Sequence, residues 1–178
     1  MGSPRPLGNT ALLVDVVLAD LARRRIRVER VVLGERRVAG CLGHDDCAER
    51  SACPLGDDAA DILDLVYAAD GLILATPVYY ENVSAQMKAF IDRNVFRYAH
   101  DEWPRAKVVG LVAITAETGQ DETLAALRRY VALSTDGEVP LFSVSGSADT
   151  AGSAAENREL LAGARRLAAD VLEASVER

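Results

Sequence analysis

The stretch Gly71-Leu72-Ile73-Leu74-Ala75-Thr76-Pro77 decides the fold, because it is a short apolar run that stops abruptly at a proline. A run of this kind is typical of a strand buried on both faces of a parallel sheet. A helix is expected to begin near Ser84, with Ser84 as its N-cap, because Met87, Phe90, Ile91 and Val95 then fall on one face. Strand, loop and helix therefore follow one another, as in an α/β protein.

The same alternation extends along the rest of the chain. Strands are predicted at 26–33, where charged and apolar residues alternate, at 107–114 and at 139–144. Pro140, near the start of the last of these strands, predicts that it lies at an edge of the sheet. Apolar residues recur at helical spacing in 12–21, 57–66, 121–131 and 160–172. We therefore predict a doubly wound parallel sheet in a three-layer α/β/α arrangement, with ligands bound beyond the carboxyl ends of the strands.

Length, composition and charge limit what the chain can be. Its 178 residues, 49% of them hydrophobic, predict a single domain over residues 1–178. A formal charge of −7 argues against a nucleic-acid partner or an anionic membrane surface, because both require a basic patch. The sequence shows neither a run long enough for a membrane span nor a signal-peptide core, so we expect a cytoplasmic protein.

The N-terminal run Gly2-Ser3-Pro4-Arg5-Pro6-Leu7-Gly8-Asn9-Thr10 leads straight into the first helix. The unpaired N–H groups and partial positive charge of a helix start can bind a phosphate. Ser3, Asn9 and Thr10 add side-chain donors, and Arg5 adds a planar cation suited to phosphate. The run therefore predicts a phosphate cradle, and the alternative is an N-capped surface helix with a proline-rich entry.

Two motifs carry a resemblance to a known family. The pattern G-S-P-R-x-x-G-N-T resembles the phosphate loop of the NAD(P)H-dependent FMN reductase and iron-sulfur flavoprotein group, which has a flavodoxin-like fold. Residues 76–88, T-P-V-Y-Y-E-N-V-S-A-Q-M-K, resemble that family's strand-to-helix loop. The resemblance implies a strand before the phosphate loop, which this sequence lacks. We therefore expect either that the natural chain begins earlier or that another strand closes the gap.

The resemblance implies FMN as a bound cofactor, held by three loops. The phosphate would contact Ser3, Arg5, Asn9 and Thr10. The ring and ribityl chain would lie along Pro77, Val78, Tyr79, Tyr80 and Asn82, because aromatic faces and amide groups suit a flat ring with a polar rim. A third loop, with Thr115 and Gly119, resembles the family's glycine-rich flavin loop, and the alternative is a helix N-cap at Thr118 or Asp121.

A loop between residues 34 and 56 contains all three cysteines of the chain. In iron-sulfur flavoproteins a compact run of four cysteines binds a [4Fe-4S] cluster, and the cysteines here match its first, third and fourth positions, with histidine at the second. Three thiolates and an imidazole could hold a cluster or zinc, and the alternative is a loop of free thiols without a metal. The candidate ligands are Cys41, His44, Cys47 and Cys53.

The resemblance implies an FMN-dependent NAD(P)H oxidoreductase that passes electrons to a flavin, a quinone or another small-molecule or protein acceptor. No side chain is expected to act as a conventional acid or base, because hydride transfer is the chemistry of the flavin. The alternative is an iron-sulfur flavoprotein-type electron carrier, with FMN and a cluster in the cysteine loop. A homodimer or homotetramer is implied in either case.

Overall fold

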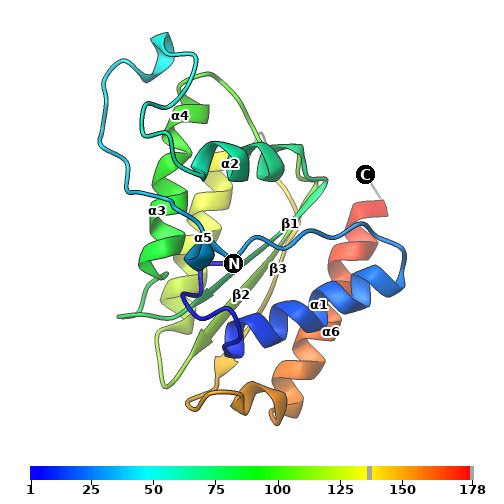
Figure 1. Cartoon of the computed structure of the whole chain (residues 1–178). Helices are drawn as coiled ribbons and strands as arrows, with labels where there is room; N and C mark the ends of the chain where they lie inside the picture. The colour runs from blue at the N-terminus through cyan, green and yellow to red at the C-terminus, as the bar shows by residue number, and fades with distance from the viewer. Residues whose placement is uncertain (136–137, 177–178) are drawn as a thin grey trace.

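Strand β2 (Val108–Thr115) is the centre of the molecule, and each of its residues is buried. It pairs in parallel with β1 (Gly71–Pro77) on one side and with β3 (Leu141–Ser147) on the other. The computed structural model describes residues 1–135 and 138–176, and Figure 1 shows this sheet between two layers of helices. The predicted doubly wound arrangement is confirmed.

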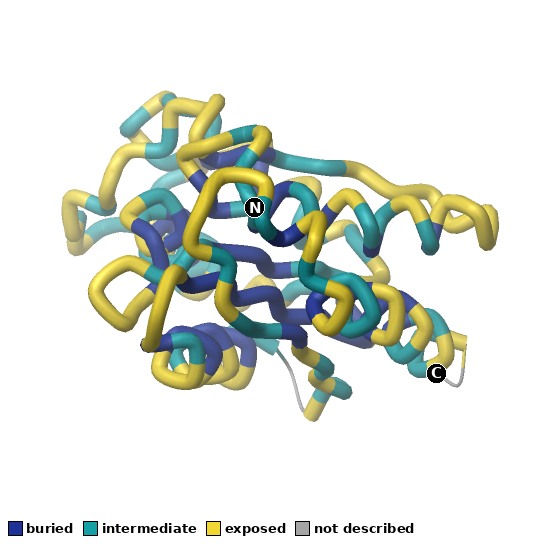
Figure 2. The backbone as a smooth tube through the Cα atoms, turned by 90° about the horizontal axis from the view of Figure 1, so that it is seen from below, coloured by how far each residue is buried: buried dark blue, intermediate teal, exposed yellow. Residues whose placement is uncertain are grey.

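Two hydrophobic cores form on opposite faces of the sheet, because successive side chains of a strand point to opposite sides. Val108, Val112 and Ile114 of β2 pack against α1 (Asn9–Arg23) and α6 (Arg158–Val176). The alternate residues Val109 and Leu111 pack on the other face against α2 (Ala59–Ala68), α3 (Ala85–Arg93) and α5 (Gln120–Ser134). Figure 2 shows the strands and the inner sides of the helices as the buried part of the chain.

Short elements connect these layers. The four-residue helix α4 (Val95–Tyr98) directly follows α3. Three 3₁₀ turns occupy Leu33–Glu35, Cys47–Glu49 and Ser153–Ala155. Within the described ranges, the structure contains no helix of the length and apolarity that a bilayer crossing requires.

The predicted strand at 26–33 is wrong. The segment has no strand pairing, and Leu33 already belongs to a 3₁₀ turn. Where the end of this segment runs beside the N-terminus, its backbone is hydrogen-bonded to Met1 only among the described N-terminal residues. The Met1 amine donates to Val31 O at 2.8 Å, and Leu33 N donates to Met1 O at 3.0 Å. Two bonds to one residue do not make a ladder, although the alternating pattern resembles that of a strand.

The edge position predicted from Pro140 is confirmed. β3 lies at one edge of the described sheet, beginning directly after Pro140, whose carbonyl accepts a hydrogen bond from Val109 N at 3.0 Å. At the opposite edge, Gly2 N donates to Ala75 O of β1 at 2.7 Å. The start of the N-terminal loop is thereby attached to the sheet beside the carboxyl end of β1.

Candidate cofactor site

Three chain segments meet at the carboxyl ends of the strands. The N-terminal loop reaches β1 through Gly2, and the loop after β1 reaches β2 because Val78 N donates to Ile114 O at 2.8 Å. The loop after β2 in turn reaches the chain beyond β3, since Ala148 N donates to Thr115 O at 2.8 Å. The three loops predicted to hold a ligand are therefore neighbours in the structure.

Ser84 joins the first two loops. Its Oγ caps α3 by accepting a hydrogen bond from Met87 N at 3.2 Å, which confirms the predicted helix N-cap. The same hydroxyl donates to the carbonyl of Gly2, and Ser84 N donates to Thr76 Oγ1 at 3.0 Å. Ser84 is fully buried, and a Cβ on Gly2 would lie 2.7 Å from Met87 Cβ. A glycine at position 2 is therefore required for this close approach.

The phosphate-loop residues lie around the first turn of α1. The helix begins at Asn9 after Gly8, and no side chain caps its N–H groups. Ser3 and Thr10 are buried, and Ser3 Oγ both accepts from Arg5 N at 3.1 Å and donates to Arg5 O at 3.0 Å. The Arg5 residue itself is exposed. An uncapped helix start beside hydroxyls and an arginine is a suitable site for an anion.

Asn9 lies at the same helix start, but its amide is directed to the chain after β3. Nδ2 donates to Ala148 O at 3.1 Å and to Thr150 O at 2.7 Å. Oδ1 accepts hydrogen bonds from the backbone N–H groups of Gly152 and Ala154. These contacts were not anticipated by the sequence, in which Asn9 reads as a phosphate donor.

The second loop contains a tight two-residue turn. Tyr79 N donates to Asn82 O at 2.9 Å, and Asn82 N donates to Tyr79 O at 3.1 Å. The two central residues, Tyr80 and Glu81, have φ of 50° and 56°, in the left-handed region that such turns usually fill with asparagine or glycine. The Tyr80 residue is fully exposed and Tyr79 is partly exposed, so aromatic side chains are presented at the edge of the site.

The third loop packs directly on the second. Thr115 Oγ1 donates to Thr118 O at 2.5 Å and accepts from Glu117 N at 3.2 Å, which folds the loop back on itself. Gly119, with φ of 87°, precedes α5 in the N-cap position, so neither Thr118 nor Asp121 is the cap. A Cβ on Gly119 would lie 2.7 Å from Glu81 Cα. The glycine therefore allows the two loops to touch.

The four candidate metal ligands do not come together. Cys41 Sγ accepts a hydrogen bond from Gly43 N, Cys47 Sγ donates to His44 O, and Cys53 Sγ accepts from Arg93 Nη2 at 3.2 Å. All three cysteines are free thiols, and residues 1–135 and 138–176 contain no group of three or more metal-ligating side chains placed to hold an ion. Because the three thiols and the His44 imidazole lie apart, they fit neither a cluster nor tetrahedral zinc as arranged.

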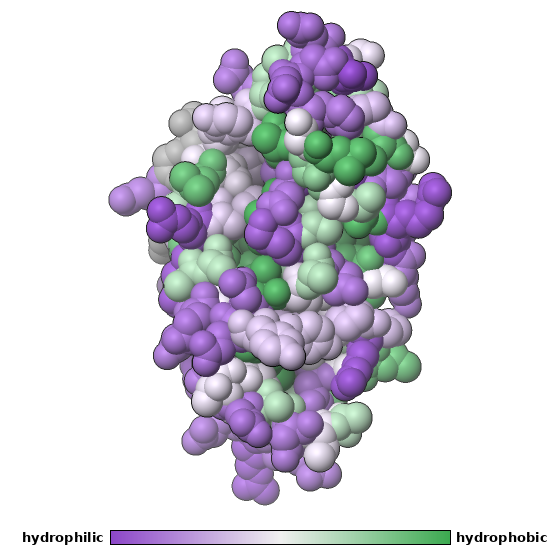
Figure 3. Space-filling model, turned by 90° about the vertical axis from the view of Figure 1, so that its left-hand side faces the viewer, coloured by the Kyte–Doolittle hydropathy of each residue, from purple (hydrophilic) through white to green (hydrophobic). Residues whose placement is uncertain are grey.

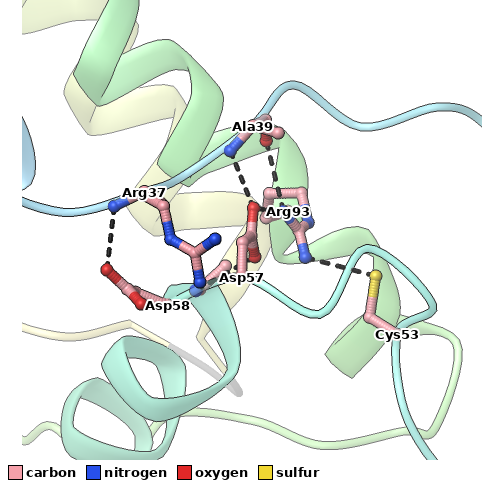
Figure 4. A network of polar contacts seen from close by, with 7 residues as sticks. Arg37, Ala39, Cys53, Asp57, Asp58 and Arg93 are labelled. Carbon is pink, nitrogen blue, oxygen red and sulfur yellow. Dashed lines mark hydrogen bonds and ion pairs between the residues drawn. The ribbon is translucent and has the colours of Figure 1, made fainter.

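A buried ion pair closes the base of the cysteine loop (Figure 4). Arg93 Nη1 lies 2.6 Å from Asp57 Oδ2, and both side chains are more than nine-tenths buried. Asp57 Oδ2 also accepts from Ala39 N at 2.8 Å, while Arg93 Nη1 donates to Ala39 O at 3.2 Å. Asp58 and Arg37 are joined beside them by two further hydrogen bonds. The loop is thus held at its neck by protein groups alone.

These contacts keep Asp57 ionised at the neck of the cysteine loop, the point where Asp57 and Arg93 hold its two ends together. Burial raises the pKa of Asp57, but the hydrogen bonds from Arg93, Ala39 and Ala59 outweigh it and hold that pKa below its ordinary value. At the tip, an Arg50 hydrogen bond lowers the pKa of Asp46. Figure 3 shows mostly hydrophilic side chains over this tip, at the top of the view. The sequence offered one signal for the neck, because Arg93 follows Phe90 by three residues and so shares its buried side.

A groove of about 430 Å³ meets these loops only at Leu7 of the phosphate loop. It runs along the outer side of α1, where Leu12, Val16 and Arg23 face Arg165 of α6. Its lining extends to the C-terminal end of α1, whereas the predicted cofactor residues surround the N-terminal end. The loops remain the candidate site, because their residue types and contacts suit a phosphate and a flat ring.

Comparisons with known proteins place this geometry in context. Residues 1–159 match the protein family described as NADPH-dependent FMN reductase. An iron-sulfur flavoprotein of Archaeoglobus fulgidus is 37% identical over 125 residues, which cover 70% of this chain and 56% of that protein. Another, from Methanocaldococcus jannaschii, is 39% identical over 132 residues, which cover 72% and 67% respectively. The chain thus matches between about half and two thirds of the length of these relatives.

The fold is shared with a solved structure. The NAD(P)H:quinone oxidoreductase of Methanothermobacter marburgensis superposes with a TM-score of 0.72, covering 96% of this chain and 94% of that one. The sequence identity is 17%, so this likeness concerns the fold. The predicted flavodoxin-like fold is confirmed.

Acidification should release the neck of the cysteine loop. The pKa of Asp57 is lower in the folded protein than in the unfolded chain, where it is about 4. The contacts of its carboxylate therefore stabilise the fold at a pH above that unfolded pKa, and this stabilisation is lost as the pH falls through the folded pKa. We expect the exchange protection of the Ala39 amide to fall below about pH 4 in the natural sequence and to be low at every pH in Asp57→Asn.

The matched control is Asp64→Asn, which removes an exposed carboxylate paired with Arg97 and should leave the Ala39 amide protected. Equal protection of that amide in Asp57→Asn and in the natural sequence would contradict the role given to the buried pair.

Proposed function

This chain belongs to the NADPH-dependent FMN reductase family, and from that membership we propose that it binds FMN at the three converging loops and oxidises NAD(P)H. The observation that carries the proposal is the uncapped start of α1, which lies beside Ser3, Arg5 and Thr10 at the carboxyl ends of the strands. An anion with an attached flat ring would place its phosphate there and its ring along the second and third loops. The bound flavin would supply the hydride chemistry.

The protein groups would bind and orient the flavin. Backbone N–H groups of the first turn of α1, the hydroxyls of Ser3 and Thr10 and the Arg5 guanidinium would hold the phosphate. The stretch 77–82 and the loop from Thr115 to Gly119 would line the ribityl chain and the ring. The Asn82 side chain already accepts from Val83 N at 2.8 Å through Oδ1, which leaves its NH₂ group to face a ligand. No residue is assigned as a catalytic acid or base.

The electron acceptor would be a small molecule or a partner protein that reaches the exposed side of the turn at Tyr80. Flavins, quinones and other flat acceptors suit an aromatic surface. The three free thiols fit a reducing compartment, in keeping with the predicted cytoplasmic location.

Removal of the Arg5 guanidinium should weaken FMN binding selectively. A hydrogen bond to a charged group contributes about 1.5–3 kcal/mol, so Arg5→Ala should raise the FMN dissociation constant by roughly one to two orders of magnitude. Riboflavin, which lacks the phosphate, should bind Arg5→Ala and the natural sequence equally. Flavin fluorescence titrations measure both constants. Arg27→Ala, a change at an exposed arginine outside the loops, is the control, and an unchanged FMN constant in Arg5→Ala would remove Arg5 from the site.

The second candidate function is an electron carrier that couples FMN to an iron-sulfur cluster. The identity to iron-sulfur flavoproteins favours it, whereas His44 and the separated thiols of the cysteine loop favour the reductase. We expect anaerobically purified protein to show flavin absorption without iron, sulfide or zinc. Stoichiometric iron and sulfide that disappear in Cys53→Ser would support the carrier instead.

We further propose that the protein is a homodimer or homotetramer. Leu7 in the phosphate loop and Tyr80 in the second loop are almost completely exposed, although both are large and partly or wholly apolar. Covering them would stabilise an assembly next to the site. Sedimentation equilibrium should therefore give a mass of two or four chains, and Leu7→Ser with Tyr80→Ser should lower it. A monomer at concentrations of about 10 µM would be inconsistent with a stable assembly.

A further inference from the structure

The loop of residues 148–154, called here the β3–α6 loop, is attached to α1 by the side chain of Asn9. Both N–H bonds of the Asn9 amide are directed to carbonyls of the loop, and the Asn9 oxygen accepts two N–H groups, at 2.9 Å from Gly152 and 3.3 Å from Ala154. A carboxamide has two donors and two acceptor positions. The β3–α6 loop therefore uses the full hydrogen-bonding capacity of Asn9.

This saturation decides what Asn9 can do. To donate to a phosphate, its Nδ2 would have to leave the carbonyl of Ala148 or that of Thr150. The Ala148 carbonyl would then lose the partner that Asn9 supplies, whereas the Thr150 carbonyl would keep its hydrogen bonds from the N–H and the hydroxyl of Ser153. Thr10 and the uncapped N–H groups of α1 can contact an anion at the helix start without such a loss. The Ser3 hydroxyl would have to leave Arg5 O, which would keep its hydrogen bond from Gly8 N at 3.3 Å. The geometry therefore separates Asn9 from the phosphate donors beside it in the sequence.

The β3–α6 loop also contacts the third ligand loop. Ala148 N donates to Thr115 O at 2.8 Å, and the preceding Ser147 donates from Oγ to Glu117 O at 3.4 Å. Gly152 has φ of 87°, a conformation in which side chains are strained and in which its N–H faces Asn9. One loop thus extends from the third ligand loop to the start of α1.

We propose that the β3–α6 loop is a fourth wall of the cofactor site and that Asn9 is the positioning residue that holds this wall against α1. The inference rests on the FMN site proposed above, and it assigns Asn9 to the loop and not to the phosphate. The wall would restrict water and slow the escape of FMN at its phosphate end, and it would remain attached to α1 when FMN binds.

The first test measures hydrogen exchange at the Gly152 and Ala154 amides, with and without FMN. If Asn9 holds the wall, both amides are protected in the apoprotein and are protected at least as strongly with FMN. If Asn9 turns to the phosphate, FMN must free both amides, and faster exchange in the complex would overturn the proposal. Protein that fails to bind FMN would refute the proposed function, while exchange in the apoprotein would still test the contact.

The second test compares a variant at Asn9 of α1 with one at Asn157, which lies between the loop and α6. Asn9→Ala should expose both amides and raise the FMN dissociation constant about tenfold, mainly through faster release. Asn157→Ala is the matched control, because Asn157 caps α6 through the N–H groups of Glu159 and Leu160 and donates to Ser147 O at 3.4 Å but, among the described residues, makes no hydrogen bond to α1. It should lower the melting temperature but change the FMN constant by less than about twofold.

Two outcomes would count against a positioning role. An FMN constant that Asn9→Ala leaves unchanged would make Asn9 a structural residue only. If Asn9→Ala does not fold, Asn9→Asp replaces it, because it keeps the size of the side chain but places a carboxylate oxygen against the carbonyls of Ala148 and Thr150. In that variant the Gly152 and Ala154 amides should lose protection, and unchanged protection would contradict the assigned contacts.

Discussion

The hydroxyl of Ser84 is the contact on which the arrangement of the site depends. It is buried, caps α3 and donates to the carbonyl of Gly2, so one oxygen atom links the N-terminal loop to the strand-to-helix loop. Substitution by alanine would leave two backbone groups without a partner in a buried place, at about 1–3 kcal/mol for each. Because Gly2 is also bonded to Ala75 of β1, the phosphate loop, the sheet and α3 form one rigid base for the cofactor.

The hydrophobic pattern of a short segment predicted those strands whose burial depends on that segment alone. The apolar runs at 71–76 and 107–114 were recognisable as strands, because a strand covered on both faces of a sheet consists almost entirely of apolar residues. The segment 26–33 has an equally good local pattern, but a strand also needs a neighbour along its length, and here the bonds go to Met1. Pairing is a property of the whole fold, so it could not be read from this segment.

The same distinction applies to the site. Ser84 was predicted as a helix cap from its position, and the structure adds its bond to Gly2, which lies 82 residues away. Asn9 looks like a phosphate donor in its motif, yet its amide contacts a loop more than 130 residues distant. Arg93 closes the cysteine loop through its ion pair with Asp57. The only sign in the sequence that Arg93 is buried is its helical spacing from Phe90. Residue types predicted the chemistry, whereas long-range partners determined which residues are available for it.

The contact between Gly119 and Glu81 has a consequence for how the site can move. Since no Cβ separates the two backbones, a displacement of the turn at Tyr80 must also displace the start of α5. The second and third loops are therefore in contact at this point, and the turn cannot move toward α5 without displacing the third loop. A ligand that pushes the turn toward α5 acts against the stiffness of both.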